Sequence, residues 1–112
     1  MKVSELKGEL LDYWVARALG YASRDDVPSS LTGEWAENGF KNEWQPSIDW
    51  AQGGPFIERE RIELECNSEG MWYAKRLEDE YMRHEEGATP LIAAMRAYVA
   101  SKFGEEVPGS AD

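Results

Sequence analysis

The segment 89–104, TPLIAAMRAYVASKFG, constrains the fold most, because it encodes a helix with a signal at each end. Thr89 is a residue type that caps helix N-termini, and Pro90 suits the first helical position, where no N–H is needed. Gly104 is able to end the helix in the left-handed conformation. Apolar residues recur between these signals at helical spacing, at Leu91, Ile92, Met95, Tyr98, Val99 and Phe103. The pattern predicts a helix whose apolar stripe packs against a core.

A second helix is predicted over Glu9–Leu19, followed by Gly20 as its C-terminal signal. Residues 62–77 predict a β-hairpin, because Ile62, Leu64 and Cys66 alternate with glutamates before the turn NSEG. A four-residue turn over 67–70 pairs Cys66 with Met71. This register puts Cys66, Met71, Tyr73 and Leu77 on the inner face and Trp72 on the opposite face.

The remaining segments complete the predicted architecture. Residues 21–47 are rich in turn formers and contain Trp35, Phe40 and Trp44, so we expect an aromatic-rich loop that packs down. Residues 77–88 are polar and predict a solvated loop or a helical extension. We therefore expect an α+β fold with two main helices packed on a small antiparallel sheet, the β-hairpin 62–77. A single globular domain should span 1–107, with a loose tail over 108–112.

Composition narrows the function classes. The chain has 22 acidic and 12 basic residues, a net charge of −10, which argues against binding nucleic acid or an anionic membrane. Most of these acidic residues are expected to lie on a solvated surface. The alternative is that they form a surface that mimics DNA. The single histidine, His84, has no serine or cysteine motif near it, so no catalytic triad is expected, and a single cysteine allows no cysteine zinc cluster. We expect no catalytic residues, no metal and no cofactor.

The stretch 49–55, DWAQGGP, is the candidate site. One interpretation is a tight turn with a buried tryptophan, in which the glycines supply backbone freedom. The other is a cleft over 49–61 with Pro55 opening a helical turn, so that free N–H groups of the glycines face an acceptor. Aromatic side chains with directed polar groups would suit a planar ring such as a nucleobase. The residues assigned to this cleft are Trp44, Asp49, Trp50, Gln52, Gly53, Gly54, Arg59 and Arg61.

Three ordered blocks resemble a known family. They are MKVSELKGELLDYWVARALG, PSIDWAQGGPFIERERIEL and TPLIAAMRAYVASKFGEEV. These blocks resemble the NinX-like small proteins of tailed phages and prophages, a domain of unknown function. The resemblance implies a phage accessory protein that acts in the bacterial host cytoplasm, and it implies no catalytic residues.

Three functions from different classes remain open at this point, one of them an enzyme. The first is a non-catalytic binding protein that holds a small host-derived ligand, such as a nucleotide, in the 49–61 cleft. The second is an acidic interaction module that blocks or redirects a host protein. A homodimer is a further alternative, in which some of the five tryptophans would be covered by a second copy of the chain.

Overall fold

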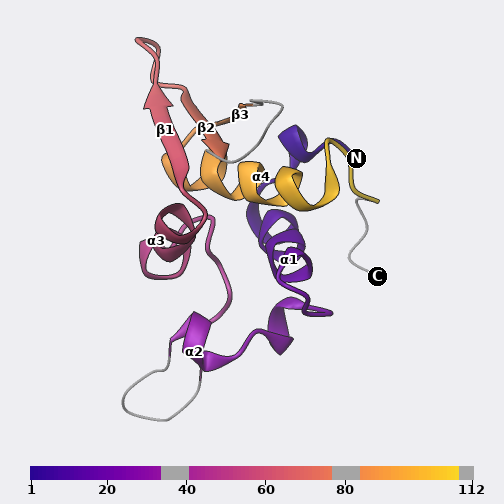
Figure 1. Cartoon of the computed structure of the whole chain (residues 1–112). Coiled ribbons are helices and arrows are strands. Elements are labelled where there is room, and N and C mark those ends of the chain that lie inside the picture. The colour runs from indigo at the N-terminus through magenta and orange to yellow at the C-terminus, as the bar shows by residue number, and fades with distance from the viewer. Residues whose placement is uncertain (34–40, 77–83, 109–112) are drawn as a thin grey trace.

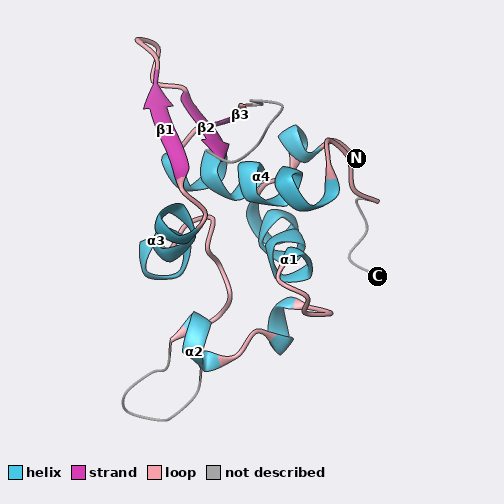
Figure 2. Ribbon diagram, in the orientation of Figure 1, coloured by secondary structure: helices cyan, strands magenta, loops and turns pink. Residues whose placement is uncertain are grey.

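The computed structural model describes residues 1–33, 41–76 and 84–108 of the chain. Helices and one antiparallel sheet make up this described part, so the fold is α+β, as predicted (Figure 2). In chain order the elements are η1 (Val3–Glu5), α1 (Gly8–Ala18), η2 (Arg24–Asp26), α2 (Ser29–Thr32), α3 (Trp50–Arg59), β1 (Ile62–Cys66), β2 (Trp72–Arg76), β3 (Glu85–Gly87) and α4 (Pro90–Phe103).

Helix α4 is the centre of the molecule. It lies between the sheet on one side and α1 on the other (Figure 1). The predicted caps are confirmed: the Thr89 hydroxyl oxygen accepts a bond from Ile92 N–H at 3.1 Å, and Gly104 follows with a φ of 85°. Burial extends beyond a stripe, because neighbours pack on several sides of the helix. The buried residues are Leu91, Ala93, Ala94, Met95, Ala97, Tyr98 and Val99.

Helix α1 is also confirmed, within one residue at each end. Gly20 follows it with a φ of 101°, a conformation that glycine adopts at little cost. Six consecutive residues of α1 are buried, from Leu11 to Ala16. Trp14 meets the ring of Phe103 edge-on at 5.4 Å between centroids, so α1 and the end of α4 share an aromatic contact.

The hairpin register differs from the prediction by one residue. Cys66 lies opposite Trp72, and Leu64 lies opposite Ala74. The Asn67 side-chain oxygen accepts bonds from the backbone N–H groups of Glu69 and Met71, which lengthens the turn to 67–71. The predicted four-residue turn is therefore wrong. Trp72, which was assigned to the outer face, packs against the core instead.

Cys66 was expected to point inward, but it is exposed. It lies near the tip of the hairpin, which projects beyond the helices (Figure 1). Leu77, the last residue assigned to the return strand, lies outside the described residues.

The third strand, β3, was not predicted. It pairs antiparallel with β2, so that the strand order is β1-β2-β3. A side chain at Gly87 would place a Cβ 2.5 Å from the backbone nitrogen of Ala93, so glycine allows β3 to lie against α4. Arg96 of α4 fixes this strand by donating a bond to the backbone oxygen of Glu86 at 2.7 Å.

The N-terminus and the segment after α4 are joined by backbone bonds. Val3 N–H donates to Glu105 O at 2.8 Å, and Val107 N–H donates to Met1 O at 2.9 Å. Val107 is buried. Of the predicted tail over 108–112, only residue 108 is described, and it is exposed.

The segment 21–47 includes two short helices, η2 and α2, where we expected only a loop. Trp44 is buried, as expected for an aromatic that packs down. Trp35 and Phe40 lie outside the described residues. Within the described ranges, no helix is long and apolar enough to cross a membrane.

Candidate functional site

The DWAQGGP stretch forms the start of α3. The Asp49 carboxylate accepts a bond from Ala51 N–H at 2.9 Å and thereby caps the helix, which begins at Trp50. The prediction that Pro55 opens a helix is wrong, since Pro55 lies inside α3. Gly53 N–H donates to Asp49 O at 2.8 Å, so it is occupied within the helix. The glycines therefore do not present free N–H groups at a helix start.

Gln52 holds the preceding segment against α3. Its side-chain oxygen accepts a bond from Gln45 N–H at 2.6 Å, and its side-chain nitrogen donates to the oxygens of Thr32 and Glu43 at 3.0 and 2.8 Å. Only 3% of Gln52 is exposed. These bonds give the amide a structural role, whereas the sequence pattern predicted that it binds a ligand.

Trp44 also belongs to the core. Its ring meets that of Phe56 at 6.1 Å between centroids. Gly53 allows the chain to pass close by, since a Cβ there would lie 2.4 Å from Pro46 O. Among the predicted site residues, Trp44, Gln52 and Gly53 thus form the inner side of this region.

Trp50 stands on the outer side, where 55% of it is exposed. The neighbouring Ile48 is 68% exposed. Trp14 and Trp44, by contrast, are buried, and Trp72 is half-buried. A Cβ at Gly54 would lie 3.8 Å from the Trp50 ring, so the indole lies over a position that carries no side chain. We refer to Ile48 and Trp50 together as the Trp50 surface.

Arg59 and Arg61, the two basic residues assigned to the cleft, have different structural roles. Arg59 contacts Glu60 at 3.0 Å and lies over the Phe56 ring, 4.8 Å from its centroid. Arg61 has a φ of 51° and turns the chain from α3 into β1. A hollow of about 360 Å³ between α2 and α3 is lined by Gln52 and Arg59 among others. It brings these two predicted residues together, but Asp49, Trp50 and Arg61 do not line it.

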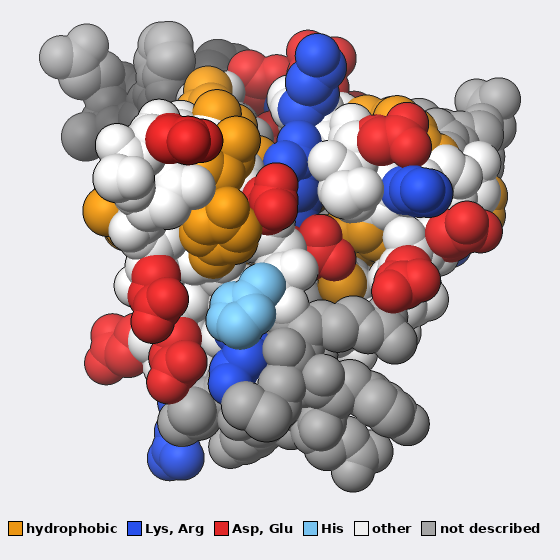
Figure 3. Space-filling model, turned by 90° about the horizontal axis from the view of Figure 1, so that it is seen from above, with side chains coloured by type: hydrophobic (Ala, Val, Ile, Leu, Met, Phe, Trp, Pro, Cys, Tyr) orange, Lys and Arg blue, Asp and Glu red, His pale blue; other side chains and the backbone are white. Residues whose placement is uncertain are grey.

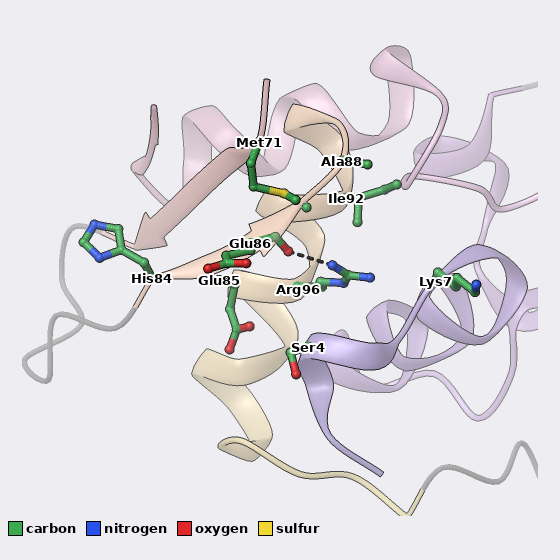
Figure 4. Close-up of a pocket in the computed structure, with 10 residues that line it drawn as sticks. Ser4, Lys7, Met71, His84, Glu85, Glu86, Ala88, Ile92 and Arg96 are labelled. Carbon is green, nitrogen blue, oxygen red and sulfur yellow. Dashed lines mark hydrogen bonds between the residues drawn. The ribbon is translucent and has the colours of Figure 1, made fainter. Parts of the chain in front are cut away.

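A larger hollow of about 570 Å³ lies between η1, β3 and α4. Figure 4 shows Met71 and Ile92 on one side of it and Arg96 near its centre. Arg96 donates to Leu6 O at 2.8 Å as well as to Glu86 O, and burial lowers the pKa of its guanidinium. Its bonds hold η1 and β3 to α4. None of the predicted site residues lies here. The signal for Arg96 in the sequence is an arginine within an otherwise apolar helix.

Asp12 is a second missed residue. It lies on α1 with 3% of its surface exposed. Its carboxylate accepts two bonds from Ser47, and burial raises its pKa to about 6. Its signal in the sequence is an acid inside the otherwise apolar run LLDYWVA. The bonds tie the segment before α3 to α1.

The charged side chains of the described residues bear on two further possibilities, a metal site and a mimic of DNA. In the ranges that the structure describes, no group of three or more His, Cys, Asp or Glu side chains could hold a metal ion. Figure 3 shows acidic side chains scattered over the face seen there, with basic side chains between them. That face shows no rows of acids, which a mimic of DNA would need.

These features describe a small α+β protein built around one central helix, with an exposed tryptophan at the start of another helix. The family model described as "Bacteriophage P22, NinX" matches residues 2–102, and the chain belongs to this family. The resemblance seen in the three sequence blocks is thereby confirmed. No curated protein is detectably similar to the chain.

Proposed function

We propose that this phage accessory protein acts in the host cytoplasm by binding a host protein through the Trp50 surface. The observation that carries the proposal is the exposure of both Trp50 and Ile48, which are two residues apart in the chain. Tryptophan is enriched among the residues that contribute most to protein–protein binding, because a large ring is desolvated in the complex. A buried core anchor would not leave the indole in water.

The surroundings of the indole support a flat contact. Trp50, Gly54 and Glu58 are spaced four residues apart on α3, so they follow one side of the helix. Gly54 adds no side chain beside the ring. Asp49 directly precedes Trp50, Glu58 lies two turns further along α3, and the chain has a net charge of −10. A partner with an apolar socket and a basic rim fits this surface, and opposite charge would speed association.

Native mass spectrometry of tagged protein purified from infected cells tests the proposal. We expect the wild-type protein to retain a host protein and Trp50→Ala to lose it while keeping its melting temperature. Phe103→Leu is the matched control, because it removes the ring of another exposed large apolar residue, 42% exposed, and keeps an apolar side chain against Trp14. Retention of the same partner by Trp50→Ala, or absence of any partner from the wild type, would overturn the proposal.

A small ligand in the hollow between α2 and α3 is the second candidate. Gln52 and Arg59 line this hollow, and the Arg59 guanidinium could pair with the phosphate of a nucleotide-like ligand. The same spectra would then show a small retained mass that disappears in Arg59→Ala. Sedimentation at several concentrations separates both candidates from a homodimer that covers the Trp50 surface, since only the homodimer gives a concentration-dependent mass of the purified chain.

A further inference from the structure

We propose that the outer edge of β1 binds a strand of another protein in which basic and apolar residues alternate. This interaction is independent of the Trp50 surface. It rests on the strand order, the direction of the backbone groups of β1 and the charges beside them.

The edge is open in the described part of the structure. Strand β1 pairs with β2 on one side only, because the order is β1-β2-β3. No backbone bond from another described segment reaches the outer side of Ile62–Cys66. The hairpin projects from the body, and no described helix or strand runs along the outer side of β1 (Figures 1 and 2). Such an edge is a template for an added strand.

The turn determines which backbone groups face outward. Asn67 N–H donates to Met71 O at 2.9 Å, so this pair is hydrogen-bonded across the hairpin. In an antiparallel pair, bonded and non-bonded positions alternate. Glu65 and Glu63 therefore bond to β2. The N–H and C=O groups that point away from β2 belong to Ile62, Leu64 and Cys66, three alternate residues along the edge.

The side chains of β1 define the preferred partner sequence. Ile62 and Leu64 are directed to the core side of the sheet, which leaves Glu63 and Glu65 on the other side. The Glu63 side chain is 55% exposed and lies 4.0 Å from Lys75, and Glu65 is exposed opposite Tyr73. An added strand would place its own alternate residues beside these carboxylates. Lysine or arginine is favoured there, and apolar residues are favoured at the positions beside Leu64 and Cys66.

The same charges argue against a second copy of this chain. Pairing β1 with β1 would bring Glu63 and Glu65 beside glutamates of the other copy, and like charges on neighbouring strands repel. The net charge of −10 adds to this repulsion. The occupant is therefore a basic strand of a different protein.

A labelled peptide of alternating valine and lysine is the probe, with binding to the full chain followed by fluorescence anisotropy. The Cys66 N–H points away from β2, so Cys66→Pro blocks the edge without removing a hairpin bond. We expect Cys66→Pro to weaken binding about tenfold, since it removes a hydrogen bond and inserts a ring. Cys66→Ser, which keeps the N–H, should bind like the wild type. Equal binding by the two variants, with both folded, would overturn the proposal.

A second experiment distinguishes strand pairing from non-specific attraction between opposite charges. Glu65→Lys should weaken binding of the lysine peptide up to about tenfold and favour a peptide of alternating valine and glutamate. Glu5→Lys changes the net charge equally but lies on η1, which contacts β3 at the other edge of the sheet. Equal weakening by both variants would show non-specific attraction and contradict the edge site. Trp50→Ala should leave peptide binding unchanged, so failure of one surface does not imply failure of the other.

Discussion

Ser47 and Asp12 are joined by two hydrogen bonds inside the protein. The Ser47 backbone N–H donates to Asp12 Oδ1 at 2.9 Å, and its hydroxyl donates to Oδ2 at 3.1 Å. The residues lie 35 positions apart in the chain, so the contact connects α1 to the segment that leads into α3. The bond pair holds the approach to the Trp50 surface against the core.

Asp12 should make the protein less stable as the pH rises from about 4 to about 6. Burial raises the pKa of the folded-state carboxyl from 3.8 to about 6, so the folded protein binds this proton more tightly than the unfolded chain does. The stabilising contribution is fully present below the unfolded pKa and is lost as the pH passes the folded pKa. Two pKa units correspond to about 3 kcal/mol. Urea unfolding at a series of pH values measures this slope.

Asp12→Asn isolates the effect, because an amide can accept the Ser47 N–H bond and donate to the Ser47 hydroxyl without titrating. We expect this variant to lose the part of the pH dependence that lies between about 4 and 6. Asp25→Asn, a change at an exposed aspartate, serves as the control and should keep the wild-type slope. The same slope in wild type and Asp12→Asn would contradict the assignment.

Gln52→Ala should destabilise the fold by about 1–3 kcal/mol, since it removes the side-chain hydrogen bonds of three backbone groups, one of them in a buried bond. Those groups are Gln45 N–H and the carbonyls of Thr32 and Glu43. Thermal and urea unfolding measure the loss. Gln45→Ala is the control, because Gln45 contributes its backbone N–H, which the substitution keeps. An unchanged midpoint for Gln52→Ala would show that its bonds are dispensable and would favour a ligand role for the amide.

The adjacent glycines Gly53 and Gly54 should respond oppositely to alanine. Gly53→Ala brings a Cβ within 2.4 Å of Pro46 O and 2.8 Å of the Leu91 side chain, so it should cost about 1–3 kcal/mol through overpacking. Gly54→Ala meets only the Trp50 ring at 3.8 Å and should stabilise α3 by about 0.5–1 kcal/mol. The difference between their free energies of unfolding is the measurement. Equal effects would mean that α3 packs differently.

Met95→Ala should lower the free energy of unfolding by about 2–5 kcal/mol, because Met95 is fully buried in the centre of α4. Lys102→Ala on the exposed side of the last turn is the matched change in the same helix. It should stay within about 1 kcal/mol of the wild type. A midpoint for Met95→Ala equal to that of Lys102→Ala would place the methionine outside the core.

Local chemistry explains which elements were predictable. The boundaries of α4 follow from Thr89 and Gly104, and the end of α1 follows from Gly20, since each signal acts within a few residues. The hairpin was also predictable as an element, because alternation is local. Its register was not, because the alternation allowed two turn lengths and the Asn67 side chain selected the longer one.

The sequence predicted where in the chain the candidate site lies, but it did not predict the role of each of its residues. The sequence singled out Trp50 and Gln52 together, two residues apart. On a helix that separation turns side chains by about 200°, so the two point to different sides. Recognising Asp49 as the cap would have predicted this helix and the separation.

By itself the sequence determined the α+β class, the two long helices and the family, since these depend on periodicity, nearby caps and ordered motifs. Only the tertiary structure decided that Gln52 is inside and Trp50 outside, that β3 joins the sheet and that Asp12 meets Ser47. Each of these outcomes depends on contacts between distant segments, such as Arg96 with Glu86 or Gln52 with Thr32. Burial and pairing at such positions are properties of the packed chain, because the groups that satisfy them are supplied by other elements.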